Sequence, residues 1–538
     1  MAASSRAFLS ISSRRSATKS SSSRILSLAS AEPSELQIDD NAVTAVCNSL
    51  RRRHTWETLA KELNSINLTN SLVRRVLLNL KDTSNATKAL NFFHWSGKSA
   101  RFNHGVLTYC ITIHILAKAR LVKDAKALLE SVLTKPGNSD VFTVLDSLLE
   151  SYETIDSVPF VFDLFVQVCS KLRLLVLDRA FDVCKSLDEN GFLLSVVSYN
   201  TLLHVLQKSE NHRLVWDVYG HMIAKRVNPN QTTVETMVSA LCKEGRLQWF
   251  VDLVGRIHGK RCGPGVVVNT RLIHGMIEDG RTEEGLVLLK RMLQKNMIVD
   301  TVSYSLVVFA KVKTGDLDSA WNTYHEMLKR GFQGNAFVYH IFISSHCDNG
   351  GVDDAIVLAR EMEKVNMKPL LETFDSLLKG CSNSGRVNES LGFCKKMVQI
   401  GYVPSPWAFN VMTEKLCENG MAKEADQMLT VLLDKGFVPD KNAYYHLLAG
   451  HAKEGDIDGA LKLYYEMEYR SISPNSSCFT WLIIGLCKVG RLSEAEKLLC
   501  LMKARSLSPS SDLCKLLISC QLEKGDQSRA DQLYREMI

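Results

Sequence analysis

The sequence predicts an all-α fold, an α-solenoid (superhelix) of tandem 35-residue helix–turn–helix repeats. Three observations predict it: four residue types share a 35-residue spacing, apolar residues fall at helical intervals within each repeat, and proline is scarce. The chain has 538 residues but only 11 prolines, as suits a chain that is mostly helix. A single hydrophobic core rarely serves a chain of this length, so a repeat array or several domains are expected.

The 35-residue spacing holds for glycine, methionine, alanine and proline alike. The glycines in unbroken register are Gly245, Gly280, Gly315, Gly350, Gly385, Gly420, Gly455, Gly490 and Gly525. The other series are Met292, Met327, Met362, Met397, Met467, Met502 and Met537; Ala320, Ala355, Ala425, Ala460, Ala495 and Ala530; and Pro369, Pro404, Pro439, Pro474 and Pro509. Four series with one period are the signature of a repeat architecture.

Residues 441–475 show what each series does. Apolar positions at i, i+3, i+4 and i+7 define one face of a first helix, namely Tyr444, Leu447, Leu448 and His451. Gly455 lies where that helix must end, the usual place for a residue with positive φ. In the second helix Ala460 is small because the two helices pack closely there, and Pro474 ends the unit.

Counting in 35s divides the chain into four regions. We expect an organellar transit peptide in 1–31, a linker and leading helix in 32–70, degenerate repeats in 71–195 and a regular array in 196–538. The degenerate repeats are 71–105, 106–140, 141–158 (a first-helix length only) and 159–195, and the regular array is nine full repeats, 196–510, followed by a truncated one, 511–538. Stacked units of this kind leave one elongated concave surface.

The first 31 residues differ in composition from the rest. They are rich in serine, contain no acidic residue, and carry five cations, Arg6, Arg14, Arg15, Lys19 and Arg24. This composition is typical of a transit peptide, for a mitochondrion rather than a chloroplast because the arginines are numerous; a disordered cytosolic tail is the alternative. The five cations account for most of the formal charge of +7. Any nucleic-acid affinity of the remainder must therefore come from a local basic stripe.

The sequence carries no recognisable catalytic or metal motif. Its fifteen cysteines include no C-x-x-C pair, and Cys242, Cys347, Cys417 and Cys487 instead recur at the same place in different repeats, as buried small residues do. No histidine has a glutamate two residues on, and no phosphate-binding glycine loop occurs. No uncharged apolar run approaches the roughly 18 residues that a membrane helix needs. We expect no enzyme activity, cofactor, metal, membrane or small-molecule substrate.

Lysine recurs at repeat position 13, at the end of the first helix. We interpret Lys208, Lys243 and Lys313 as phosphate contacts, since a cation repeated on one face of several units forms a stripe that can track a backbone. The alternative is that these lysines are solvated helix ends, favoured there by the helix dipole.

Units such as VVSYNTLLHVLQKSENHRLVWDVYGHMIAKRVNPN (196–230) closely resemble the pentatricopeptide repeat, with its V-x-Y-N start and P-N end. The lead-in at 89–109 also resembles plant mitochondrial members, and the near-constant length of 35 resembles the P class. The resemblance covers about 106–538. It implies sequence-selective binding of single-stranded organellar RNA, in RNA processing, stabilisation, splicing or translation, alongside other RNA-processing proteins. The alternative is a helical-repeat scaffold that binds a protein partner in its concave groove.

The resemblance also implies which residues touch RNA. The fifth and last residues of a repeat read the base edge, and the second packs against the base face. The matching pairs are Asn200 with Asn230 (pyrimidine), Thr270 with Asp300 (guanine), Ser305 with Asn335 (adenine) and Asn410 with Asp440 (uracil); the stacking residues are Val197, Val267, Val302, Phe337 and Trp407. Polar side chains on rigid helices can match the edge of a splayed base, and apolar ones tolerate any base. The alternative is that the edge-reading residues only cap helices.

Overall fold

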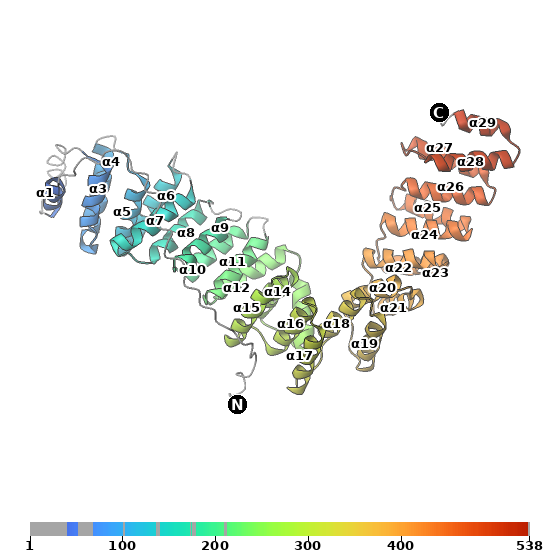
Figure 1. Cartoon of the computed structure of the whole chain (residues 1–538), viewed down its shortest axis with the longest axis horizontal. Coiled ribbons are helices and arrows are strands. Elements are labelled where there is room, and N and C mark those ends of the chain that lie inside the picture. The colour runs from blue at the N-terminus through green and yellow to red at the C-terminus, as the bar shows by residue number, and fades with distance from the viewer. Residues whose placement is uncertain are drawn as a thin grey trace. The chain divides into compact units, whose positions relative to one another are not determined.

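The computed structural model describes residues 40–51, 68–99, 103–135, 140–172, 174, 179–208 and 212–535. Within these residues the regular structure is helical, with no strand, and successive helices form hairpins (Figure 1), which confirms the predicted all-α repeat fold. The predicted transit peptide and most of the 32–70 linker lie outside the described residues. The chain divides into two compact units, residues 1–198 and 199–538.

The first unit contains the helices that precede the regular array. They are α1 (Asp40–Arg51), α3 (Asn70–Asn79), the 3-10 helix η1 (Thr83–Asn85), α4 (Ala86–Ser99), α5 (Val106–Lys118), α6 (Val122–Thr134), α7 (Val141–Ile155), α8 (Phe160–Lys171) and α9 (Arg179–Glu189). α7 packs against α5, and α8 packs against α6. α7 therefore follows α5 in the layer of first helices, and α8 follows α6 in the layer of second helices. The division by sequence instead assigns α7 and α8 to different repeats, 141–158 and 159–195.

The second unit contains the regular hairpins. Its first helices are α10 (Val196–Leu206, which begins at the unit boundary), α12 (Gln231–Lys243), α14 (Pro264–Glu278), α16 (Asp300–Lys313), α18 (Ala336–Asp348), α20 (Leu371–Asn383), α22 (Pro406–Glu418), α24 (Lys441–Glu454), α26 (Ser476–Lys488) and α28 (Ser511–Glu523). Its second helices are α11 (His212–Ala224), α13 (Leu247–His258), α15 (Thr282–Gln294), α17 (Leu317–Lys329), α19 (Val352–Lys364), α21 (Val387–Gln399), α23 (Ala422–Asp434), α25 (Ile457–Tyr469), α27 (Leu492–Ala504) and α29 (Gln527–Arg535). Each second helix begins at repeat position 17.

The glycine and alanine series explain this regularity. All nine glycines of the 35-residue series have φ between 69° and 85°, the left-handed region that ends a helix and that residues with a Cβ seldom adopt. Ala425 and Ala460, at repeat position 20, are fully buried between the two helices of their hairpins. A small side chain there lets the two helices approach closely, so the hairpins that have one close in the same way.

Ion pairs join the second helices of neighbouring repeats. Arg386 pairs with Asp353, and Arg491 Nη1 lies 2.7 Å from Asp458 Oδ1, in each case 33 positions along the chain. Such exposed pairs contribute little stability individually. They do identify which second helices are neighbours.

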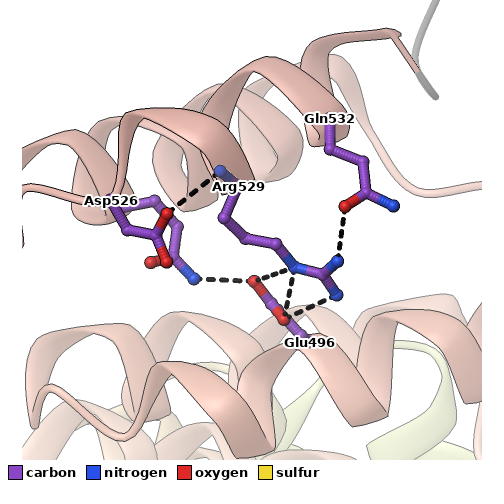
Figure 2. Close-up of polar contacts among 5 residues, drawn as sticks. Glu496, Asp526, Arg529 and Gln532 are labelled. Atoms are coloured by element: carbon purple, nitrogen blue, oxygen red, sulfur yellow. Dashed lines mark hydrogen bonds and ion pairs between the residues drawn. The ribbon is translucent and has the colours of Figure 1, made fainter.

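The last of these contacts, between α27 and α29, is drawn in Figure 2. Arg529 donates from Nε and Nη2 to Glu496 Oε2 at 3.1 and 3.0 Å. Glu496 Oε1 also accepts from Gln521 Nε2 at 2.6 Å, so side chains of both helices in the last hairpin meet one carboxylate. The carboxylate therefore fixes this hairpin against the preceding one.

The second helix α13 does not lie in the layer that the other second helices form. Arg281, in α15's N-cap, pairs with Asp217 of α11 at 2.6 Å, 64 positions away, rather than with a residue of α13. α11 packs directly against α15, and α13 packs more extensively against α14 and α16 than against its own first helix, α12. α15 therefore occupies, against α11, the place that α13 would take in a regular stack.

The residue at position 20 accounts for this displacement. Where most repeats have alanine, glycine or serine, the repeat 231–265 has Phe250. A phenyl ring cannot fit where a methyl group separates two helices at close contact, and overpacking such a position strains the hairpin. Phe250 is fully buried, but against other helices.

Candidate nucleic-acid interface

We call the surface that carries repeat positions 2, 5 and 35 of the regular array the reading face. Positions 2 and 5 lie one turn apart at the start of a first helix. Position 35 precedes the next first helix and in many repeats is its N-cap, as at Asn230, Asn335, Ser405, Asp440, Asn475 and Ser510. The last residue of a repeat therefore does cap the next helix in these repeats, as the alternative interpretation of the edge-reading residues predicted. It brings positions 5 and 35 of one repeat close together.

The repeat 406–440 shows this geometry fully. Asn410 Nδ2 donates to both carboxylate oxygens of Asp440, at 3.0 and 3.2 Å. Asp440 Oδ1 also accepts from the backbone N–H groups of Asn442 and Ala443 at 2.9 and 3.0 Å. Trp407, three residues before Asn410 on α22, is 55% exposed, and Lys379 Nζ lies 5.2 Å from its ring centroid. An exposed ring thus stands beside a fixed polar pair.

The pair Asn200 and Asn230 has the same arrangement. Asn200 Nδ2 donates to Asn230 Oδ1 at 3.0 Å, and Asn230 is held by a capping box with Thr233. The predicted stacking residue Val197 is exposed. The sequence therefore correctly predicted that Asn200 and Asn230 meet. Their contact with RNA stays a prediction.

The predicted adenine and guanine readers are placed differently. Asn335 Nδ2 donates to Ser305 Oγ at 3.0 Å, so this pair also forms, but both residues are buried. Thr270 Oγ1 donates to the Val266 carbonyl at 2.8 Å instead, and Asp300 is the first residue of α16, with Val299 as N-cap. Thr270 and Ser305 are both 0% exposed.

The stacking positions of three consecutive repeats are buried as well. Val267, Val302 and Phe337 lie in the core, whereas Trp407 is exposed at the same repeat position. The sequence alone predicted all of them as surface residues able to meet a base. In this structure the reading face is accessible at both ends of the array. Between residues 266 and 370 it is buried at the stacking positions and at Thr270, Ser305 and Asn335, whereas Asp300 is exposed.

The cover is α13. It contacts α14, α16 and α18, and its Trp249 and Phe250 rings each lie 5.6 Å, edge to face, from the ring of His274 on α14. His258 Nδ1 lies 2.9 Å from Thr301 Oγ1, at the start of α16. The signal for this in the sequence was Phe250, the aromatic residue in the alanine register.

His340, at position 5 of the repeat 336–370, belongs to the covered stretch. Burial lowers the pKa of His340 to about 4, partly offset by the nearby Glu372 carboxylate. Its Nδ1 is buried without a hydrogen-bond partner among the described residues. A neutral imidazole is therefore part of this packed region.

The predicted phosphate contacts Lys208, Lys243 and Lys313 are all exposed. Lys243 Nζ donates to the Gln207 carbonyl at 2.9 Å, near the end of the preceding first helix, which agrees with the helix-end alternative. Lys313 Nζ lies 5.7 Å from the Phe309 ring centroid. Contact of Lys208 and Lys313 with phosphate stays a prediction.

The recurring cysteines are mostly structural, as predicted. Cys347, Cys417 and Cys487 are buried, and burial raises the pKa of Cys347 to about 12; the prediction is wrong for Cys242, which is exposed. No group of three or more histidine, cysteine or acidic side chains that could hold a metal occurs in the part of the chain that the structure describes. The helices of that part are all too short or too polar to cross a membrane.

Tandem helical hairpins with a polar and aromatic reading face define a repeat protein of the α-solenoid class. The model of the PPR repeat family matches residues 194–243, 299–348 and 439–488, and that of the PPR repeat matches 270–297, 337–367, 372–402 and 477–507. The chain therefore carries pentatricopeptide repeats over these residues.

Two curated relatives come from Arabidopsis thaliana and are named mitochondrial. Pentatricopeptide repeat-containing protein At1g66345 is 47% identical over 204 residues, 38% of this chain and 37% of the relative. At1g11710 is 29% identical over 213 residues, 39% of this chain and 31% of the relative. The matches thus span about a third of each relative. Among solved structures, PPR10 in complex with an 18-nt psaJ RNA element has 18% identity and a TM-score of 0.29, over 92% of this chain and 93% of that one.

Proposed function

We propose that this chain binds single-stranded RNA through the accessible parts of its reading face and catalyses no reaction. The observation that carries the proposal is the repeat 406–440, where exposed Trp407 lies beside the hydrogen-bonded Asn410–Asp440 pair. An exposed indole can stack on any base, and a fixed amide–carboxylate pair can hydrogen-bond to a base edge. The match of 194–243, 299–348 and 439–488 to the PPR repeat family supports the same function.

We place this activity in a mitochondrion, with RNA processing, stabilisation, splicing or translation as the process served. The names of the curated relatives and the composition of residues 1–31 support this location, with the chloroplast as the alternative. A chain that catalyses no reaction would act by occupying the RNA, which blocks nucleases or prevents refolding. Other RNA-processing proteins would then supply the chemistry.

The test is RNA binding by the full chain, measured by fluorescence anisotropy on a uridine-rich single strand and on sequences selected from a random pool. Trp407→Ala should weaken binding by about 5- to 150-fold, since stacking on one aromatic ring contributes about 1–3 kcal/mol per base. Binding should also fall steeply with salt, because phosphate contacts release counterions.

The matched control is Tyr469→Ala, which removes an aromatic ring that is 90% exposed on the second helix α25. This variant should bind RNA as the unaltered chain does. Absence of salt-dependent RNA binding by the full chain, together with stoichiometric recovery of a protein from mitochondria, would replace this proposal with the scaffold function.

A further inference from the structure

We propose that α13 masks the reading face of repeats 266–370, so that their base-reading positions do not contribute to the RNA sequence that the chain prefers. The inference rests on the proposed function and specifies which repeats carry it. It assigns sequence preference to the accessible repeats, above all 406–440.

The chemistry of α13 fits the surface it covers. One side of the helix is apolar, and Phe250, Leu253, Val254 and Ile257 are buried there. The opposing first helices present apolar residues at the stacking positions, Val267, Val302 and Phe337. Apolar surface on both sides is removed from water, which favours the covered arrangement over an open one.

Polar contacts fix where α13 lies along the array. Trp249 Nε1 donates to Glu372 Oε1 at 2.7 Å, and Arg256 Nη2 donates to the Tyr402 hydroxyl at 3.2 Å. Glu372 occupies position 2 of its repeat and is therefore itself part of the reading face. Together with the contact between His258 and Thr301, these bonds tie α13 to the first helices α16 and α20 and to the turn that follows α21.

A base and α13 cannot occupy this surface together. Thr270 and Ser305 have no exposed area, so no base edge can reach them while α13 is in place. Moving α13 away would return its four buried apolar side chains to water and leave their partners uncovered. RNA that contacts the accessible repeats gains nothing from the masked ones.

The displacement is built into the repeat. Phe250 prevents α13 from closing on α12, and α15 already fills the vacant place beside α11, where Gly220 lets Leu272 and Leu288 approach closely. The second-helix layer is therefore complete without α13. The position of α13 over the reading face is therefore compatible with close packing in both the layer of first helices and the layer of second helices.

The test uses two isosteric substitutions at repeat position 35, with selection from a random RNA pool. Asp440→Asn, in an accessible repeat, should relax the uracil preference at one RNA position toward any pyrimidine. Asn335→Asp, in a masked repeat, should leave the selected sequence unchanged. Both side chains remain good N-caps. Asn335→Asp also replaces the buried amide that donates to Ser305 by a carboxylate, so circular dichroism is used to select conditions in which both variants are folded. A shift from adenine to guanine caused by Asn335→Asp alone would overturn the inference.

A second arm removes the mask. Phe250→Ala restores alanine to position 20, and in this background Asn335→Asp should change the selected base and the protected RNA should lengthen. If circular dichroism shows that Phe250→Ala does not fold, Trp249→Ala with Arg256→Ala loosens the polar contacts of α13 from its partly exposed edge instead. Masked repeats that stay silent in a folded variant with α13 released would contradict the inference.

A third measurement does not depend on RNA. A photo-crosslinking amino acid in place of Trp249 should link to the peptide that contains Glu372. Failure to form this link overturns the inference even if RNA binds. Formation of the link in a chain that binds no RNA leaves α13 where we place it and rejects the proposed function alone.

Discussion

The repeats 266–370 and the repeats 406–475 have the same register, second helices that begin at the same repeat position and the same left-handed glycines, yet their reading faces differ. In the first stretch the stacking residues Val302 and Phe337 are buried, and in the second Trp407 is exposed. The polar pairs form in both: Ser305 with Asn335, and Asn410 with Asp440. What separates the two stretches lies outside both of them, in α13.

This difference shows that a base-reading motif is not by itself an accessible one. Repeat register brings positions 5 and 35 together where the last residue of the repeat caps the next first helix, as at Asn410 and Asp440. Access depends on whatever else packs on the face, and here one aromatic residue in the preceding repeat decides it. Substitutions that alter one stretch and leave the other intact test whether α13 causes the difference.

The largest contrast should come from alanine at repeat position 2. Phe337→Ala should lower the free energy of unfolding by about 3–5 kcal/mol, since it empties a buried site. Trp407→Ala should change it by less than about 0.5 kcal/mol, as exposed substitutions do. Urea denaturation of both variants checks this. Equal costs for the two would mean that the stretches do not differ in burial.

Placing a bulky residue at position 20 of the open stretch should reproduce the strain of the masked one. Ala425→Phe should cost about 1–3 kcal/mol of stability, because the side chain is fully buried between α22 and α23. Val431→Phe, on the exposed side of α23, is the matched control and should be neutral. A well-tolerated Ala425→Phe would remove our explanation of why α13 is displaced.

The helix caps should behave alike in both stretches. Asn335→Ala and Asp440→Ala should each cost about 1 kcal/mol, the usual loss when an N-cap side chain is removed. Thermal unfolding of the two variants would reveal whether the caps are equivalent despite their different exposure. A much larger loss of stability for Asn335→Ala would indicate that burial under α13 strengthens the hydrogen bond between Asn335 and Ser305.

The smallest effect concerns pH. Burial holds the pKa of His340 near 4, below the ordinary value of about 6.5. Between these two pH values His340 is protonated in the unfolded chain and neutral in the folded chain. The stability that this histidine contributes is complete above about pH 6.5 and is lost as the pH falls toward 4. His340→Gln should therefore show a shallower loss of stability between pH 7 and pH 4.5. An unchanged pH dependence would show that His340 is not held neutral.

The sequence predicted the repeat architecture well because its signals are local. The glycine series marks the ends of first helices, and the alanine series marks where each hairpin closes, so both depend on residues within one unit. The Asn410–Asp440 pair was predictable for the same reason, since it depends on register and on Asp440 as the cap of the next helix. The predicted Thr270–Asp300 pair does not form, because Asp300 lies inside α16 and Val299 is its cap.

The masked stretch was not predictable in the same way. Phe250 was visible as an aromatic residue in the alanine register, and it could have signalled an irregular hairpin. The place that α13 takes instead depends on partners such as Glu372, 123 positions from Trp249. No spacing rule encodes contacts at that separation, because they follow from packing of the assembled array.

The long reach of α13 also bears on how the array folds. In a simple solenoid each repeat interacts only with its neighbours, so units can form or melt nearly one at a time. α13 ties the repeat 231–265 to residues as far as Tyr402, which joins five repeats into one cooperative block. We expect this block to protect its amides from hydrogen exchange as a unit. It should also fold more slowly than the flanking hairpins, because its contacts close long loops.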